Sequence, residues 1–339
     1  MNCKPILGIL LGDATGVGPE LVAKLAVNNF YADHCRPVII GDVRVFEMGL
    51  ATVKGEAAHY VISDIEQADW EKGIPVLDQH NQDPAQITRC QPSTYCGAAC
   101  IEMLTTAVEL YKAKKIDGFS FAPLNKSAMI QSGCKFESEH HLMAHLFQHT
   151  EPLGEINVLG DVWTTRTTSH IPISKVSENL TVNSILRALR LANATLKNAG
   201  IERPHLGVAA LNPHAGEHGL CGREELDVIE PAIAKANEMG IWADGPFPSD
   251  ILFIKAFRGD FNGVVTMYHD QGQIALKLKG FDQGITIAGG LPAPIVTCAH
   301  GTAYDITGKG IASTSAFENA VKMTSKMAMH IRETQSVNA

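Results

Sequence analysis

The chain has 339 residues, 45% of them hydrophobic and 6% aromatic, with a formal net charge of −8 and an isoelectric point near 5.9. A chain of this length usually forms two domains, each with its own buried core. Lysine and arginine are scattered without a basic stripe, which argues against nucleic acid or an anionic membrane surface as a partner. An anionic small substrate is still compatible with this charge, because the field of a pocket is local.

The amino terminus predicts a strand and no export signal. "MNCKPILGILLGD" has one lysine and a short apolar run, whereas a signal peptide needs a longer apolar region and a small-residue cleavage site. No stretch approaches the roughly 20 apolar residues of a membrane span. The eight cysteines form no CxxC pair, which is typical of reduced thiols. We therefore expect a cytoplasmic protein.

Helical and strand-like segments alternate along the chain, which predicts an α/β fold with parallel strands. A strand at 5–11 leads into a glycine-rich loop at 12–20 and a helix that begins near Pro19. The segment 100–115 has one apolar helical face and ends in cations, as the helix dipole favours. A short helix is predicted at 124–133, and further strands at 36–42, 116–123, 155–160, 205–211 and 262–268.

The loop "GDATGVGPE" (12–20) has part of a dinucleotide-binding fingerprint. The third glycine of GxGxxG is missing, because Gly18 is followed by Pro19, Glu20 and Leu21. Two interpretations stay open: a tight strand-to-helix turn and an anion-binding loop.

Three histidines share one kind of sequence context. His170, His214 and His269 each come shortly after a strand-like run. Ligands of open parallel sheets bind outside the carboxyl ends of the strands, so a folded sheet could bring these side chains together. Three neutral imidazoles suit a divalent metal such as Zn²⁺, Co²⁺ or Mn²⁺ and leave positions open for substrate oxygens. The alternative is three separate structural histidines, because no short-range ligand motif covers such gaps.

Six motifs carry a family resemblance: "GDATGVGPE", "APLNK", "TTSHIPI", "LNPHAGEHG", "MYHDQG" and "HGTAYDITGKG". Together they resemble the 4-hydroxythreonine-4-phosphate dehydrogenase (PdxA) family over nearly the whole chain. The last motif is also similar to the adenine-side loop of isocitrate and isopropylmalate dehydrogenases. The resemblance implies two α/β domains flanking a cleft, as in those dehydrogenases, and a homodimer with the active site near the interface.

The same resemblance implies the domain limits. A discontinuous domain of residues 1–130 plus 290–339 would carry the adenine loop of the cofactor. The second domain, 131–289, would carry the metal ligands and the dimer interface.

The resemblance also implies a chemistry. The family oxidises a secondary alcohol with NAD or NADP and a divalent metal (Zn, Mn, Co or Mg). The metal ligands here would be His170, His214 and His269, with Asp250 nearby. We expect a small hydroxy acid, free or phosphorylated, as the substrate, with or without decarboxylation of the product. The cofactor contacts would be His300, Gly301, Thr302, Ala303 and Asp305.

The chain departs from the family where the substrate is held. Thr286 stands where the family has asparagine, and Ile295 stands where it has arginine. In "FESEHHLMAH", His140 matches a family histidine and His141 replaces a threonine. We expect His140, His141 and Thr286 to contact a substrate other than the family's namesake. A second metal site at His141 and its i+4 neighbour His145 is an alternative.

The missing arginine predicts a replacement cation. Arg166 lies four residues before His170, so in an extended strand both side chains share a face. We predict that Arg166 binds the substrate anion, helped by Lys277, His140 and His141; a surface arginine on an edge strand is the alternative. Lys277 and Lys126 are the candidate general bases, and Lys126 could instead pair with a phosphate or a helix end.

Two further classes of function compete with a dehydrogenase. A metal-dependent lyase or hydrolase would also use a histidine trio with open positions. The 300–310 loop argues against it, because such an enzyme needs no adenine site. A two-lobed solute-binding protein is disfavoured by the lack of an export signal.

Overall fold

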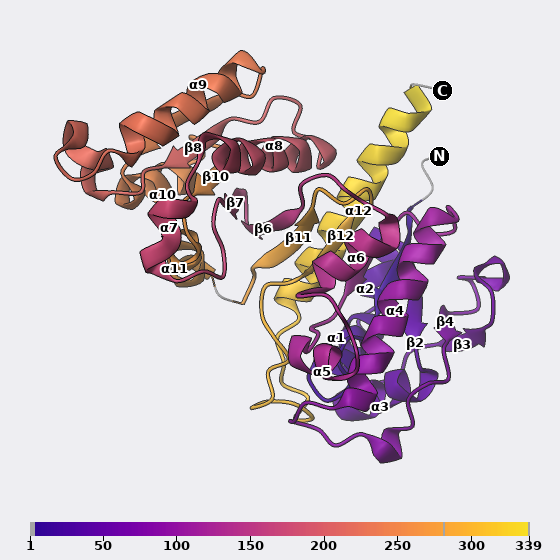
Figure 1. The fold of residues 1–339 in the computed structure, drawn as a ribbon. Coiled ribbons are helices and arrows are strands. Elements are labelled where there is room, and N and C mark those ends of the chain that lie inside the picture. The colour runs from indigo at the N-terminus through magenta and orange to yellow at the C-terminus, as the bar shows by residue number, and fades with distance from the viewer. Residues whose placement is uncertain (1–3, 281, 338–339) are drawn as a thin grey trace. The chain divides into compact units, whose positions relative to one another are not determined.

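The computed structural model describes residues 4–280 and 282–337 (Figure 1). Its contacts divide the chain into two compact units: unit 1 is Met1–Thr150 with Leu291–Ala339, and unit 2 is Glu151–Gly290. The sequence-based boundary at residue 130 therefore differs from the observed one. Residues 131–150 belong to unit 1, because α6 (Glu139–Phe147) packs against α4 (Thr94–Lys112) of that unit.

Unit 1 is built on a parallel sheet with strand order β3-β4-β2-β1-β5-β12. The strands are β1 (Ile6–Leu10), β2 (Arg36–Gly41), β3 (His59–Ile62), β4 (Ile74–Asp78), β5 (Gly118–Phe121) and β12 (Ile295–Cys298). The helices are α1 (Gly18–Val27), α2 (Phe30–His34), α3 (Val43–Val53), α4, α5 (Lys126–Gln131), α6 and α12 (Ser315–Val337), with short 3₁₀ turns η1 (Ile65–Gln67) and η2 (Pro84–Gln86).

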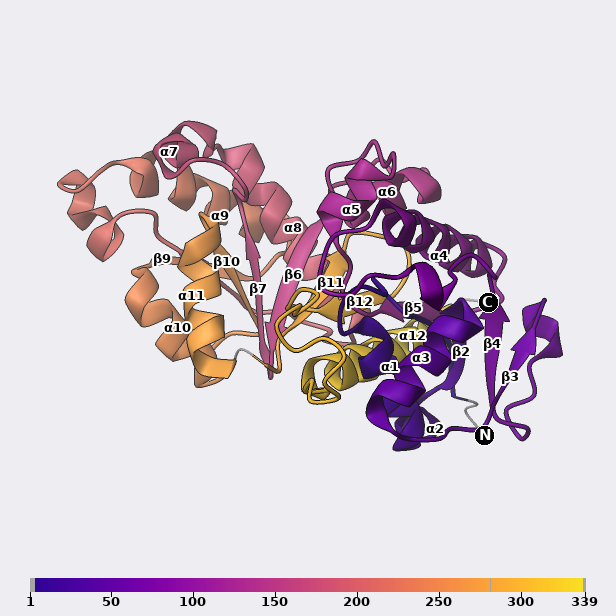
Figure 2. The ribbon, with the colours of Figure 1, turned by 90° about the horizontal axis from the view of Figure 1, so that it is seen from below.

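Helices cover both faces of this sheet. Figure 2 shows α4 on one face and α1, α2 and α12 on the other. The strands are buried on both sides and therefore consist of continuous apolar runs, with Leu7, Ile9 and Ile39 fully buried. The predicted helix at 100–115 begins earlier than expected, at Thr94, because Ser93 caps it by accepting a hydrogen bond from the Cys96 amide.

Unit 2 has a mixed sheet with strand order β11-β6-β7-β10-β8-β9. The strands are β6 (Gly154–Leu159), β7 (Val162–Arg166), β8 (Leu206–Ala209), β9 (Ala243–Phe247), β10 (Gly263–Thr266) and β11 (Ile285–Gly289). The helices are α7 (Val176–Asn179), α8 (Val182–Asn198), α9 (Glu230–Glu238), α10 (Ser249–Phe257) and α11 (His269–Gly280), with η3 (Ile173–Lys175), η4 (Pro213–Gly219) and a π-helical turn η5 (Glu225–Ile229).

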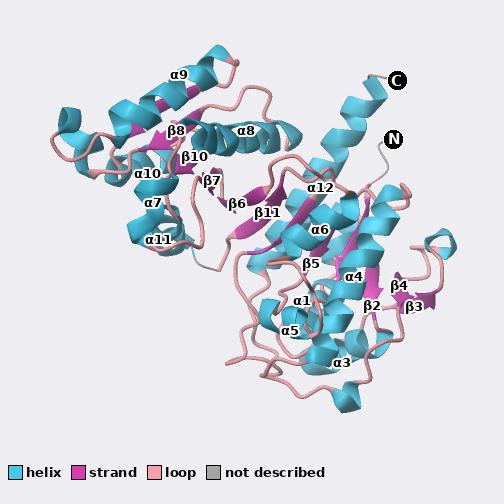
Figure 3. Ribbon diagram, viewed as in Figure 1, coloured by secondary structure: helices cyan, strands magenta, loops and turns pink. Residues whose placement is uncertain are grey.

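The α/β class is confirmed, and helices and strands alternate along most of the chain (Figure 3). Parallel pairing holds for β7, β10, β8 and β9, but β6 runs antiparallel to both β7 and β11. Only two residues, Gly160 and Asp161, join β6 to β7, and a parallel connection would need a much longer crossover. Within the part of the chain that the structure describes, no helix combines the length and apolarity needed to span a bilayer.

Candidate functional site

The three predicted metal ligands lie at one edge of the unit 2 sheet. β7, β10 and β8 are neighbouring parallel strands, so their carboxyl ends meet at the same edge. His170 follows β7, His214 follows β8, and His269 follows β10 as the first residue of α11. This is the edge at which open parallel sheets bind ligands.

Two of these histidines are direct neighbours, and two are oriented by carboxylates. The ring centroids of His170 and His269 are 5.9 Å apart. Nδ1 of His269 lies 2.7 Å from Asp270 Oδ1, and Nδ1 of His214 lies 2.6 Å from Glu217 Oε1. A carboxylate at Nδ1 holds the proton there and leaves Nε2 as the ligand atom. Both side chains reach solvent, with 38% of His269 and 71% of His214 exposed.

His214 is presented by an unusual turn. All five residues from His214 to His218 have positive φ, between 44° and 77°, although only one of them is glycine. Such backbone persists only where the surrounding structure enforces it. Here the carboxylate of Glu225, 1% exposed, accepts hydrogen bonds from the amides of Leu211 and Asn212 at 2.8 Å each. The sequence pattern did not identify Glu225 as the anchor of this turn.

Asp250 and Lys277 lie at different distances from the histidine edge of unit 2. Asp250 is exposed in the first turn of α10, directly after β9, and so lies at the same sheet edge as the histidines. Lys277 is exposed on α11, eight residues after His269. That separation is about 12 Å along a helix axis. The Lys277 backbone therefore lies well away from the edge.

Arg166 is buried in a network of its own unit. Its side chain is 8% exposed and forms an ion pair with Glu155. Nη1 donates to Asn157 Oδ1 at 2.9 Å, and Nε donates to Ser169 Oγ at 2.8 Å. β7 is an interior strand, so the alternative of a surface arginine on an edge strand is wrong. Anion binding by Arg166 stays a prediction, and the guanidinium already has partners within the chain.

Two of the positions that depart from the family, Thr286 and Ile295, are buried. Thr286 in β11 accepts a hydrogen bond from Asn157 Nδ2 at 3.0 Å. Ile295 in β12 is fully buried. An arginine placed at 295 would therefore enter an apolar interior, which argues against a simple restoration of the family cation.

The predicted cofactor loop belongs to unit 1 and is held by the 12–20 loop. His300 is half-buried, and its Nδ1 lies 2.9 Å from the carbonyl oxygen of Gly301. The amide of Val17 donates to the carbonyl of Thr302 at 3.0 Å. A Cβ on Gly16 would lie 2.7 Å from Thr302, so only glycine permits this approach. The 12–20 loop thus supports the predicted cofactor loop, a role that neither of its two sequence interpretations included.

Side chains strengthen the same junction. The hydroxyl of Tyr304 lies 3.0 Å from Thr15 Oγ1 and accepts from Asn125 Nδ2 at 2.7 Å. The buried carboxylate of Glu20 accepts from the amide of Ala312 at 2.8 Å. Ala303 adopts a φ of 49°. None of Glu20, Asn125 and Tyr304 was predicted to matter, although each lies in or beside one of the quoted motifs.

His140 and His141 have opposite environments on α6. His140 is buried, with Nδ1 3.6 Å from Glu139 Oε1, and Lys126 Nζ lies 3.5 Å from Glu139 Oε2. His141 is exposed, and its Nδ1 lies 2.9 Å from Ser138 Oγ at the start of the helix. His145 packs against the Phe136 ring instead, with centroids 4.9 Å apart. Lys126 and His140 therefore share Glu139, while His141 stands apart.

Comparison with known proteins places this arrangement in a family. The model of the pyridoxal phosphate biosynthetic protein PdxA matches residues 33–324. The chain belongs to the PdxA family. A Rhizobium meliloti (strain 1021) protein, provisionally assigned as 4-hydroxythreonine-4-phosphate dehydrogenase 2, is 42% identical over 329 residues, covering 96% of this chain and 94% of the relative.

Two other relatives extend the comparison. A D-threonate 4-phosphate dehydrogenase of Cupriavidus necator is 35% identical, covering 96% of this PdxA-family chain and 97% of the relative. The crystal structure of a 4-hydroxythreonine-4-phosphate dehydrogenase from Burkholderia phymatum is 37% identical, has a TM-score of 0.82 and covers 96% of this chain and 99% of its own. The family resemblance expected from the motifs is confirmed.

A second group of possible metal ligands lies in unit 1. Among the described residues, the one set of three or more His, Cys, Asp or Glu side chains with ligand atoms within 4.8 Å of one another is Asp42, Asp78 and His80. Asp42 is already bonded to Arg44, by Nε at 2.9 Å and Nη2 at 2.7 Å. These bonds lower the pKa of Asp42 although partial burial, the largest single influence, raises it. The guanidinium occupies the place where a cation would bind.

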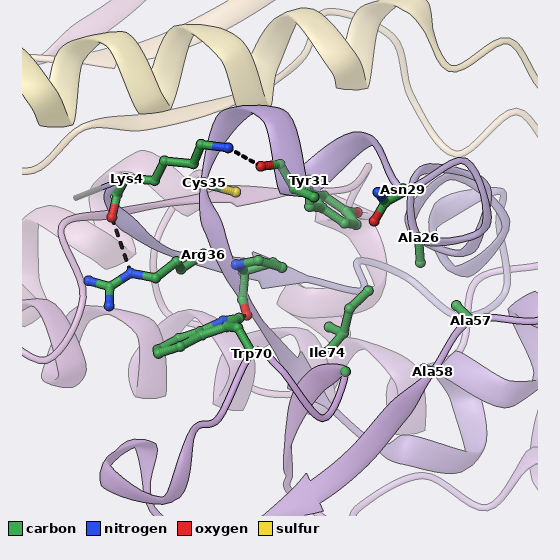
Figure 4. A pocket seen from close by; sticks show the side chains of 13 residues that line it. Lys4, Ala26, Asn29, Tyr31, Cys35, Arg36, Ala57, Ala58, Trp70 and Ile74 are labelled. Carbon is green, nitrogen blue, oxygen red and sulfur yellow. Dashed lines mark hydrogen bonds between the residues drawn. The ribbon is translucent and has the colours of Figure 1, made fainter. Parts of the chain in front are cut away.

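A cavity of about 320 Å³ in unit 1 is lined by none of the predicted site residues (Figure 4). It opens near the start of β2, at the amino edge of the sheet. Lys4 Nζ bonds the Ala32 carbonyl, and the Arg36 guanidinium stacks 4.8 Å from the Trp70 ring centre. Burial raises the pKa of Cys35 to about 12, so its thiol is unreactive. The cavity contributes no group to the candidate PdxA site.

Proposed function

We propose that this PdxA-family protein is a divalent-metal-dependent dehydrogenase that oxidises a secondary alcohol of a small phosphorylated hydroxy acid with NAD or NADP. The observation that carries the proposal is the set of three histidines at one sheet edge, two of them with Nδ1 bonded to a carboxylate. Relatives named as dehydrogenases of 4-hydroxythreonine 4-phosphate and D-threonate 4-phosphate support the reaction and the substrate class.

The donor set fits a transition metal. His170, His214 and His269 offer imidazole nitrogens, which suit Zn²⁺, Co²⁺ and Mn²⁺ better than Mg²⁺, whose preferred ligands are oxygens. A bound divalent ion would lower the pKa of the substrate alcohol and stabilise the charge that develops on its oxygen. Asp250, at the same edge, would orient the substrate hydroxyl or a ligand histidine.

The general base, the substrate pocket and the cofactor site are assigned to other residues. Lys277 or Lys126 would take the alcohol proton, and His140, His141 and Thr286 would contribute to the substrate pocket. The nicotinamide cofactor supplies the hydride acceptor. We assign its adenine side to the segment after β12, through His300, Gly301, Thr302, Ala303 and Asp305.

The proposed homodimer is supported by apolar side chains exposed on unit 2. Ile251 and Ile254 on α10 are spaced by three residues, and Ile274 and Leu278 on α11 by four, so each pair forms a stripe on its helix. Exposed apolar surface of this kind often marks a subunit contact. Sedimentation velocity of wild type and Leu278→Glu tests this: a dimer that the substitution weakens is expected, and a wild-type monomer contradicts it.

The experiment that tests the function is an assay of NAD(P)H formation. D-threonate 4-phosphate and 4-hydroxythreonine 4-phosphate are each supplied with NAD or NADP, with Zn²⁺, Co²⁺ or Mn²⁺, and with a chelator as the control. We expect reduction of the cofactor that depends on the metal. Full activity in the chelator contradicts the metal role. Product formed without any nicotinamide cofactor favours the lyase or hydrolase alternative.

A further inference from the structure

A row of polar side chains crosses the interior of the unit 2 sheet. Asn157 in β6 is 6% exposed and stands directly opposite Thr286 in β11 on one side and Thr164 in β7 on the other. Both threonines are buried as well. An interior sheet position is normally apolar, and a buried amide is stable there only when its hydrogen bonds are made.

Asn157 makes three side-chain hydrogen bonds. Its Oδ1 accepts from Arg166 Nη1 at 2.9 Å and from Gln273 Nε2 at 2.6 Å. Its Nδ2 donates to Thr286 Oγ1 at 3.0 Å. One oxygen atom therefore joins the end of β7 to the helix α11.

Each donor to that oxygen is closely connected to a proposed metal ligand. Arg166 also donates from Nε to the hydroxyl of Ser169, the residue before His170. Gln273 lies one turn after His269 on α11, on the same helical face. The two histidine rings meet with their centroids 5.9 Å apart. The link from His170 to His269 thus runs through Asn157 Oδ1.

Glu155 completes the network and compensates the positive charge of Arg166. The carboxylate pairs with the guanidinium, so Arg166 brings no net charge to the row. Removing either partner would leave an uncompensated charge in a largely buried place. The ion pair therefore resists rearrangement. Arg166 is therefore better suited to hold the 166–170 segment than to attract an anion.

We propose that Asn157 is a positioning residue that sets the separation of His170 and His269 and so preorganises the metal site. This inference rests on the proposed function, because it assigns both histidines to one metal ion. Partners that orient metal ligands through hydrogen bonds typically change metal affinity by roughly 10–100-fold when they are removed. Asn157 acts one step further back, through the segments that carry the ligands.

The test measures the dissociation constant of Mn²⁺ or Co²⁺ by calorimetry, together with the melting temperature of the metal-free protein. Asn157→Leu keeps the side-chain size and removes the acceptor, and we expect a dissociation constant raised roughly 10-fold or more. Asn157→Asp keeps an oxygen for both donors but loses the donor to Thr286 and adds a negative charge, so it should weaken binding less than Asn157→Leu does. Arg223→Met, which removes an exposed arginine paired with Asp227 in the same unit, is the matched control and should leave the affinity unchanged.

A second comparison separates positioning from a general loss of structure. Gln273→Met removes only one donor and should weaken metal binding less than Asn157→Leu. Added to Asn157→Leu, it should have little further effect, because its action passes through the missing oxygen. Unchanged affinity in Asn157→Leu, or equal weakening by Asn157→Asp, overturns the inference. A wild-type protein that binds neither metal overturns the proposed function itself.

Discussion

The histidine edge of unit 2 and the cofactor loop of unit 1 are built in different ways. At the histidine edge, the side chains proposed to bind the metal reach solvent, and buried acceptors such as Glu225 and Asn157 hold the segments that carry them. In the 300–312 loop, the backbone itself is held, by Val17 and by the carboxylate of Glu20. Loss of a histidine side chain should therefore abolish metal binding. Substitutions in the 300–312 loop should weaken cofactor binding only in part.

The largest effect is expected from the ligand histidines. His170→Ala, His214→Ala and His269→Ala should each lose the metal and the activity, because a three-imidazole site cannot spare a donor. The loss should exceed the roughly 10-fold to 100-fold that outer partners contribute. His218→Ala, in the same turn as His214 but outside the proposed set, is the control. Metal analysis and calorimetry decide it: a variant with a full metal load has not lost a ligand.

Next in size is the buried arginine. Arg166→Ala leaves Glu155 without its cation, and we expect a loss of about 2–3 kcal/mol in the free energy of unfolding, discounted because the Glu155 side chain is 24% exposed. Denaturant titration measures this, and the double variant Arg166→Met with Glu155→Leu should recover part of it.

Kinetics of the same Arg166 variant address its predicted contact with the substrate. If the guanidinium binds the substrate anion, kcat/KM should fall by an amount equivalent to roughly 1.5–3 kcal/mol for an anionic substrate at saturating metal. If the fall in kcat/KM disappears at saturating metal, Arg166 supports the metal site and does not contact the substrate anion.

A moderate effect is expected in the cofactor loop. Asp305→Ala should raise the apparent KM for the dinucleotide, since it removes a polar contact at the adenine side, and should leave the metal dissociation constant alone. Lys309→Ala, whose Nζ bonds only the Asp305 carbonyl among the described residues, is a control for disturbance of the loop. A change confined to the substrate KM would contradict the assignment of this loop.

The smallest effect concerns Asp13, buried in the 12–20 loop. Burial raises its pKa above the ordinary value of 3.8, and bonds from Thr15 offset part of that rise. The folded state thus keeps this proton to a higher pH than the unfolded chain does. The associated stability is present below pH 3.8 and is lost as pH rises through the folded pKa.

Asp13→Asn tests that sign, because the amide cannot ionise. Its melting temperature should exceed that of wild type at neutral pH, and the difference should shrink as the pH is lowered toward 3.8. Melting curves over a pH series measure it. A difference that is independent of pH would show that ionisation of Asp13 is not the cause.

The sequence by itself determined the α/β class, the family and the position of each histidine after a strand. These features are local: a strand shows in its apolar run, and a ligand motif shows in consecutive residues. Parallel pairing then brings the carboxyl ends of neighbouring strands to one edge, so His170, His214 and His269 follow strands that end at the same edge, although their ligand atoms do not all lie within 4.8 Å of one another.

Only the tertiary structure decided which side chains hold those groups in place. The β6–β7 hairpin puts Glu155 and Asn157 beside Arg166, and nothing in the order of residues shows that register. The support of the 300–312 loop by residues near 15–20 joins segments almost 300 residues apart. Hydrogen-bond partners of this kind are set by the folding of distant segments onto one another, and a sequence pattern carries no direct record of them.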